Sequence, residues 1–132
     1  MEEFDITIVG RPIPFKRTTQ RQKWVDKSYH KYRDYKTHIK ECILEVIEGS
    51  FKDCTVRVSV NVYLAGGGMY LMGRDGDIDN YIKTALDAMN NIVFLDDRQV
   101  MAVCGRKRQC EKGNERMEIK AWKCSILTDE NL

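Results

Sequence analysis

The sequence predicts an α+β fold in which helices pack on a mixed β-sheet, with the elements in the order β-α-β-α-β-β. Two kinds of periodicity predict it: apolar residues alternate with polar ones in some stretches and recur every three or four positions in two others. The chain of 132 residues has the size of one domain and contains no linker, repeat or low-complexity tract. We therefore expect a single domain over residues 1–132.

The first half of the chain supplies a strand and a long helix. We predict the strand over residues 4–10, because three apolar residues alternate with polar or smaller ones up to Gly10. A basic loop follows. The helix is predicted over about residues 29–48, because apolar side chains there fall at helical spacing and Gly49 is a natural stop.

The second half supplies three strands and a second helix. One strand is predicted over residues 56–64, where valine and leucine alternate with polar residues. A glycine-rich loop then leads to a helix over about residues 79–90, and the apolar run 92–95 is strand-like. Two further strands, at residues 99–109 and 115–122, are joined by a turn.

The composition fits a soluble globular protein, because 42% of the residues are hydrophobic, 32% are charged and the net charge is only +2. The first residues are acidic, unlike a secretory signal, and the longest uncharged run, residues 62–73, is too short to span a bilayer. We therefore expect an intracellular, cytoplasmic protein without a membrane partner. The five cysteines include no C-x-x-C pair, so we expect buried thiols.

The small net charge hides a strongly basic N-terminal third. Residues 11–40 carry ten basic side chains and two acidic ones, a balance of +8. Aromatic side chains are interleaved with this charge, as in surfaces that neutralise phosphates and stack on exposed bases. A solvated basic face without a nucleic-acid ligand is the alternative.

The densest group of acids in the sequence is an Asp-x-Asp-x-Asp run followed, one helix length later, by a pair. These residues are Asp75, Asp77, Asp79, Asp96 and Asp97. The run is not a calcium EF-hand, because its sixth position is not glycine and its twelfth is not glutamate. The glycine-rich loop before it lacks the Gly-Lys-Ser/Thr ending of a phosphate-binding loop, so we expect no nucleotide cofactor.

Two of these acids lie at the start of the second predicted helix. Lys83 follows Asp79 by one turn on the same helix face, and Asp97 joins Asp77 and Asp79 if the run 92–95 lies beside the helix start. Three carboxylates at one point repel one another unless a cation lies between them. Oxygen ligands favour Mg²⁺ or Mn²⁺, which suits phosphodiester hydrolysis with the lysine offsetting phosphate charge.

An ordinary structural role for these residues stays open at this point. Asp79 and Lys83 are spaced for a surface ion pair that contributes a few tenths of a kcal/mol, and Asp77 for a helix cap. Caps and surface pairs are commoner than active sites, so spacing alone does not decide between the two interpretations.

Two stretches of the sequence resemble the signature of RusA-type Holliday junction resolvases. They are residues 76–88, Gly-Asp-Ile-Asp-Asn-Tyr-Ile-Lys-Thr-Ala-Leu-Asp-Ala, and residues 93–100, Val-Phe-Leu-Asp-Asp-Arg-Gln-Val. The basic, proline-containing segment at residues 10–17 is similar to the N-terminal segment common in that family. The length of the chain is also similar to that of a single family domain.

The resemblance implies a RusA-like fold and a small, homodimeric, Mg²⁺-dependent endonuclease that nicks four-way DNA junctions symmetrically in recombination and repair. Such enzymes are often carried by phages and prophages. Matched position by position, the resemblance implies metal ligation by Asp77, Asp79 and Asp97 and an essential role for Lys83. Asp96 precedes the third ligand and is a candidate helper.

The implied dimer gives the basic residues a use, because an isologous dimer places two identical sites on the symmetry-related strands of a four-way junction. Doubled, the basic block forms a broad surface for branched DNA. The residues expected to bind DNA are Lys16, Arg17, Arg21 and Lys23, extended by Arg106, Lys107 and Arg108. Two alternatives remain: a non-catalytic DNA-binding protein on the same fold, and a nuclease that prefers forks or flaps.

Overall fold

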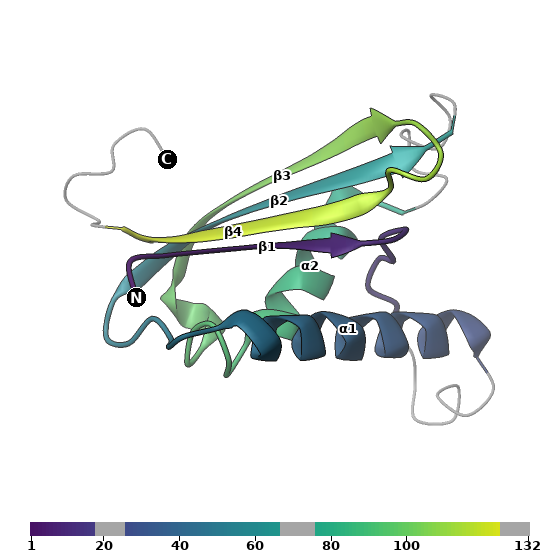
Figure 1. Cartoon of the computed structure of the whole chain (residues 1–132). Coiled ribbons are helices and arrows are strands. Elements are labelled where there is room, and N and C mark those ends of the chain that lie inside the picture. The colour runs from purple at the N-terminus through teal and green to yellow at the C-terminus, as the bar shows by residue number, and fades with distance from the viewer. Residues whose placement is uncertain (18–25, 67–75, 125–132) are drawn as a thin grey trace.

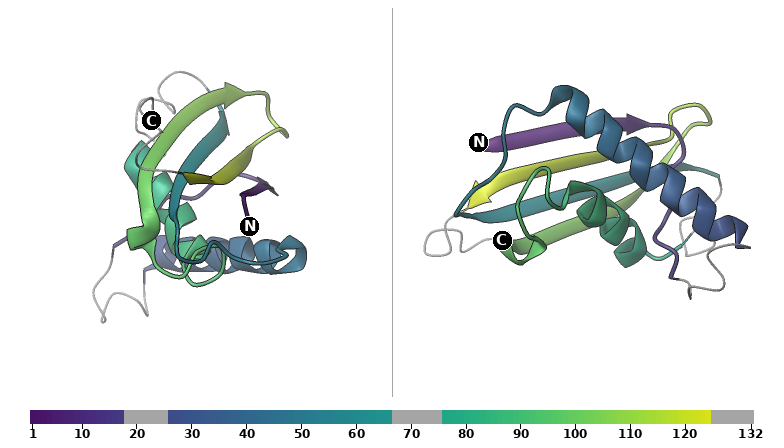
Figure 2. Two further views of the ribbon diagram at one scale, coloured as in Figure 1. Left: turned by 90° about the vertical axis from the view of Figure 1, so that its left-hand side faces the viewer. Right: turned by 90° about the horizontal axis from the view of Figure 1, so that it is seen from below.

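The predicted α+β architecture is confirmed by the structure, a computed structural model that describes residues 1–17, 26–66 and 76–124. One four-stranded mixed sheet is covered on one side by two helices, and its other side is not covered by any described element (Figures 1 and 2). The elements are β1 (Glu3–Val9), α1 (Lys27–Val46), β2 (Thr55–Ala65), α2 (Ile78–Met89), the short 3-10 helix η3 (Asp97–Gln99), β3 (Val100–Cys110) and β4 (Arg116–Cys124).

The strand order in the sheet is β1-β4-β2-β3. β4 pairs antiparallel with both β1 and β2, whereas β2 and β3 run parallel and are connected through α2. The alternation predicted for β2 is confirmed, because every second residue from Val56 to Leu64 is buried against the helices. This alternation therefore fixes which face of the sheet holds the core.

Helix α1 begins two residues earlier than predicted, because Asp26 caps it. The Asp26 carboxylate accepts hydrogen bonds from the backbone N–H groups of Ser28 and Tyr29, at 2.9 and 3.2 Å. The helix ends at Val46 with an extended Ile47 as its C-cap, slightly before the predicted glycine stop. Its buried side chains are Tyr32, Tyr35, Ile39 and Ile43.

Helix α2 lies close to β3 because Gly105 has no side chain. A Cβ atom at Gly105 would lie 2.5 Å from Ile82 Cδ1 and 3.1 Å from Ile78 Cγ1, both on α2. The missing side chain therefore sets the distance between the helix and the edge strand.

We expect Gly105→Val to lower the free energy of unfolding by about 1–3 kcal/mol, because overpacking pushes α2 away from the sheet. Urea unfolding monitored by circular dichroism measures this change. The matched control is Cys104→Val, whose side chain is exposed on the other face of β3 and should change stability by less than about 0.5 kcal/mol. Equal losses in the two variants would show that the Gly105 contact does not position α2.

The strand-like run 92–95 is not a strand, and it does not meet the condition, lying beside the start of α2, under which Asp97 would join the other acids. Ile92 and Val93 both donate backbone hydrogen bonds to the carbonyl of Met89, at 3.0 and 2.8 Å, so the chain turns immediately after the helix. Phe94 is buried and forms only isolated bridges. The run therefore lies at the C-terminal end of α2.

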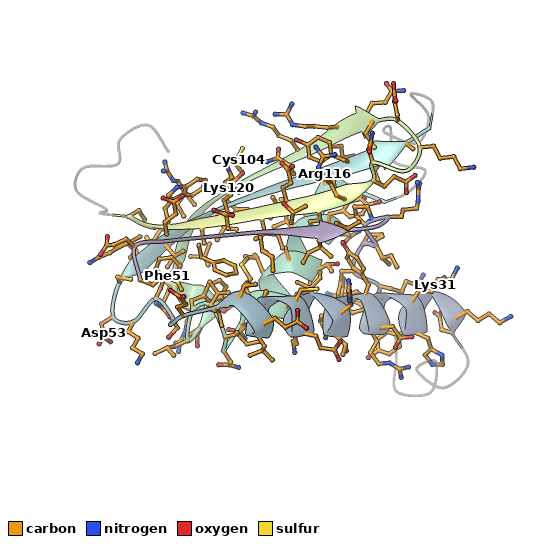
Figure 3. All side chains as sticks on the ribbon, in the orientation of Figure 1. Lys31, Phe51, Asp53, Cys104, Arg116 and Lys120 are labelled. Carbon is orange, nitrogen blue, oxygen red and sulfur yellow. The ribbon has the colours of Figure 1, made fainter. Side chains whose placement is uncertain are left out.

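The prediction that the cysteines are buried is also wrong. All five are free thiols; Cys104 is exposed and the others are partly exposed. Cys104 lies opposite Ser59 on the side of the sheet that faces away from the helices (Figure 3). Among the described residues, no helix is long and apolar enough to cross a membrane.

Candidate functional site

The start of α2 presents Asp77 without using its carboxylate as a cap. Asp77 occupies the N-cap position, but only its backbone carbonyl accepts hydrogen bonds, from the N–H groups of Asn80 and Tyr81. The residue before it, Gly76, has φ +121°, and a Cβ there would lie 2.8 Å from Pro14. The exposed Asp77 carboxylate therefore remains available for a ligand, and the interpretation as a side-chain cap is wrong.

Lys83 is held by a different acid from the one the spacing suggested. Its Nζ lies 3.8 Å from Asp87 Oδ1 and 4.9 Å from the centre of the Phe15 ring, and it forms no ion pair with Asp79. Asp87 also accepts a hydrogen bond from the Tyr32 hydroxyl at 3.1 Å. Burial, and then the nearby Asp87, raise the pKa of Tyr32, so its hydroxyl stays protonated and donates. This network places an ammonium on the exposed side of α2.

Sequence reasoning missed both partners of this lysine. The i, i+4 spacing of Lys83 and Asp87 was as clear a signal for an ion pair as that of Asp79 and Lys83. No local pattern places Phe15 there, because its contact with α2 is long-range. Asp79 is exposed and stands one turn before the lysine with its carboxylate unpaired among the described residues.

The N-terminal segment 11–17 runs along the first turn of α2. The backbone N–H of Phe15 donates to the carbonyl of Asn80 at 2.9 Å, and the Thr84 hydroxyl donates to the carbonyl of Ile13 at 3.2 Å. Two stretches more than sixty residues apart in sequence are thus joined by direct hydrogen bonds. Both carry the family resemblance.

The predicted DNA-binding residues of this segment are only partly described. Lys16 and Arg17 are exposed and directly follow the residues that dock on α2, so they lie near its start. Arg21 and Lys23 lie outside the described residues. Of these four residues, Lys16 and Arg17 are therefore the two that the structure brings near the start of α2.

The three basic residues of β3 do not share one surface. Lys107 lies on the helix side, with its Nζ 6.0 Å from the centre of the Tyr81 ring on α2. Arg106 and Arg108 alternate with it and are exposed on the opposite face of the sheet. Only Lys107 is therefore close to the start of α2.

One member of the second acidic pair, Asp96, has a structural role, and the other, Asp97, is exposed and interacts with Asp96. Asp96 caps η3: its carboxylate accepts from the backbone N–H of Arg98 at 2.8 Å and pairs with the guanidinium at 3.2 Å. The backbone N–H of Arg98, and then its side chain, hold the pKa of Asp96 below its usual range. Gln99 ties this turn to the carbonyl of Cys54 at 3.0 Å. Asp97 is exposed.

One chain does not bring Asp97 to the other two acids. The twelve residues of α2 separate its ends by about 18 Å, and Asp97 follows the C-terminal end. Along β3, about 16 Å separates Val100 from Gly105, which contacts the first turn of α2. Among the described residues, no three acidic, histidine or cysteine side chains are grouped to hold a metal.

The two acids at the start of α2 nevertheless fit a magnesium ion. Mg²⁺ is commonly bound through one or two carboxylates, with water and substrate phosphate in its other positions. Asp77 and Asp79 are both exposed, and neither carboxylate is used by the helix. Within one chain, Asp77 and Asp79 would hold the ion by themselves, because Asp97 lies at the other end of α2.

A protein-family model described as Endodeoxyribonuclease RusA matches residues 9–121. The match includes the N-terminal segment that docks on α2, all of α2, and the turn that carries Asp96 and Asp97. No curated protein is similar enough to this chain to count as a match.

Proposed function

The chain belongs to the RusA family of endodeoxyribonucleases, and we propose that it is an Mg²⁺-dependent enzyme that cuts the backbone of four-way DNA junctions. The observation that carries this proposal is the start of α2. There Asp77 and Asp79 expose carboxylates without a structural partner among the described residues, and Lys83 follows Asp79 by one turn. A protein that only bound DNA would gain nothing from unpaired acids facing an anionic ligand.

Each residue of this region then has a distinct role. Asp77 and Asp79 hold Mg²⁺ or Mn²⁺, which when bound lowers the pKa of a water ligand and polarises the phosphoryl oxygen. Lys83, held between Asp87 and the Phe15 ring, offsets negative charge that develops on the phosphate. The exposed cations Lys16 and Arg17, together with the partly exposed Lys107, bind neighbouring phosphates and fix the register of the DNA.

We further propose that Asp97 reaches the site from a second copy of the chain. In an isologous dimer whose α2 helices run antiparallel, the C-terminal end of each helix lies beside the start of the other. Asp97 of one protomer then stands near Asp77 and Asp79 of its partner. Within one chain, the length of α2 keeps Asp97 about 18 Å from Asp77 and Asp79. The three acids would therefore meet only in a dimer.

Exposed apolar side chains near the start of edge strand β3 support such an interface. Leu95, Met101 and Val103 are 51%, 51% and 40% exposed, on β3 and the turn that leads to it. Exposed apolar side chains on an edge strand can mark a contact with another chain. The homodimer provides two identical sites, which paired nicks across a junction in recombination and repair require.

Val103→Asp is expected to convert the dimer to a monomer of 15.4 kDa and to abolish cleavage while leaving the fold intact, because a charge in an apolar interface is costly. Sedimentation velocity and circular dichroism measure both effects. Val9→Asp is the control, because Val9 is 76% exposed on the opposite edge strand, β1. If both variants remain dimeric, the interface lies elsewhere.

The cleavage assay that tests the proposed function uses a labelled four-way junction and a linear duplex of the same sequence, each with Mg²⁺ and with a chelator. We expect paired nicks in the junction with Mg²⁺ and no cleavage of the duplex. Forks and flaps in the same assay test the alternative substrates. No cleavage of any branched DNA would leave a non-catalytic DNA-binding protein, and faster cleavage of forks or flaps would replace the junction as substrate.

A further inference from the structure

The side of the sheet that faces away from the helices carries an ordered set of polar, basic and aromatic residues. We call the part of this side formed by β4, β2 and β3 the open face. Paired residues on neighbouring strands point to the same side, so the registers define four rows. The rows are Trp122–Arg57–Ala102, Lys120–Ser59–Cys104, Glu118–Asn61–Arg106 and Arg116–Tyr63–Arg108. Figure 3 shows Cys104, Arg116 and Lys120 on this side.

The open face is strongly basic. It carries five cations, Arg57, Arg106, Arg108, Arg116 and Lys120, and the one acid in its rows is Glu118. Glu118 is already neutralised, because Arg116 Nε lies 2.9 Å from its Oε2 and the Tyr63 hydroxyl donates to its Oε1 at 3.2 Å. The hydrogen bond from Arg116, more than the one from Tyr63, holds the pKa of Glu118 below its usual range.

Two arginines on this face cover aromatic rings. The Arg57 guanidinium lies 4.6 Å from the centre of the Trp122 ring, and that of Arg116 lies 3.7 Å from the centre of the Tyr63 ring. Arg57 Nε is buried and has no hydrogen-bond partner among the described residues. Guanidinium planes and aromatic rings are the groups on which unpaired bases stack. The pairs stand at opposite ends of the open face, in its first and fourth rows.

We propose that the open face binds an unpaired DNA strand, with bases stacked on the two arginine–aromatic pairs and phosphates bound by Arg106, Arg108 and Lys120. A second copy does not fit, because two such faces would bring five cations against five others. A DNA duplex would not use the two arginine–aromatic pairs, because its bases stack on one another and do not expose their faces to protein side chains. Glu3 and Asp5 on β1 lie beside Trp122 and Lys120. Their negative charges repel phosphates and so limit the DNA strand to the open face.

This surface lies on the opposite side of the sheet from α2 and extends the DNA contacts beyond the proposed cleavage site. The choice of DNA as ligand rests on the proposed function. Binding of the single strand is measured in a chelator, so the result does not depend on cleavage. A protein that binds single strands here but cuts no junction would overturn the proposed function alone, and the reverse result would overturn this inference alone.

The first measurement compares a double variant of the open face with a charge-matched control. Arg106→Gln/Lys120→Gln removes two exposed cations from the face. Lys52→Gln/Lys123→Gln removes two exposed cations away from it, because Lys123 alternates with Trp122 and pairs with core-facing Val56. The ligand is a fluorescent oligothymidine of 20 nucleotides, followed by anisotropy over a range of salt concentrations.

We expect the open-face variant to bind the oligonucleotide more weakly and to lose about 1.4 from the slope of log affinity against log salt, for two phosphate contacts on a single strand. The control should keep the wild-type slope. Unchanged melting temperatures show that both variants fold. If the open-face variant binds like the control, the proposal is wrong.

The second measurement tests stacking, which charge alone does not produce. The sequence contains two tryptophans, so Trp24→Phe leaves Trp122 as the sole tryptophan reporter. We expect oligothymidine to quench Trp122 fluorescence saturably and a blunt duplex to leave it unchanged. Fluorescence unaffected by the single strand, or quenched equally by the duplex, would overturn the proposal that an unpaired strand occupies this face.

Discussion

Asp79→Asn is expected to lower junction cleavage by about 100-fold or more. Mutation of residues that only hydrogen-bond to a metal ligand already lowers metal affinity or activity by about 10–100-fold, and Asp79 is itself a proposed ligand. The substitution keeps the shape of the side chain but removes a carboxylate ligand from the start of α2. Junction binding in a chelator should be equal or tighter, because the site then presents one negative charge less to the phosphates. Single-turnover cleavage and metal-free anisotropy measure the two effects.

Asp34→Asn is the matched control for this substitution, because Asp34 is an exposed carboxylate on α1 whose partner is the neighbouring Arg33. Its cleavage rate should stay close to that of the wild type. An Asp79→Asn protein that cuts at the wild-type rate, or that folds but no longer binds the junction without metal, would exclude the proposed metal site.

Lys83→Ala is expected to lower the rate of single-turnover cleavage by about 10²–10³-fold, the loss typical when one group that stabilises transition-state charge is removed. The melting temperature should barely change, because the half-exposed pair with Asp87 contributes at most about 1 kcal/mol after solvent screening. Lys31→Ala, an exposed lysine on α1 (Figure 3), controls for the loss of one positive charge. Normal cleavage by a destabilised Lys83→Ala protein would make this lysine structural.

The elements of the fold were predictable where a local signal marks both their faces and their ends. β2 follows its valine alternation, and α2 runs between Asp77 and Asn90, close to the bounds predicted from capping residues. The run 92–95 was not predictable, because a short apolar run shows burial but does not distinguish a strand from a turn. Its conformation depends on hydrogen bonds to Met89.

The candidate site divides in the same way. Helical spacing predicted that Asp77, Asp79 and Lys83 share the first turns of one helix, and this is confirmed. The distance to Asp97 was not predictable, since it depends on which end of α2 the chain returns to. The docking of Phe15 on Asn80 was not predictable either, because no periodic pattern reports a contact between segments so far apart.

We propose above all that acids from opposite ends of α2, in two copies of the chain, form one nuclease site. Co-expression of Asp79→Asn chains with Asp97→Asn chains tests it most directly. Each homodimer of either variant should be inactive. In a mixed dimer, one site combines both substitutions, whereas the other combines the intact Asp79 of one protomer with the intact Asp97 of its partner.

With random pairing, the co-expressed preparation should therefore recover about one quarter of the wild-type site activity, and each mixed dimer should give a single nick in the junction. If all three acids act within one chain, every site in every dimer carries a substitution. A preparation that contains mixed dimers, verified by two different affinity tags, and remains as inactive as the separate variants would contradict the claim.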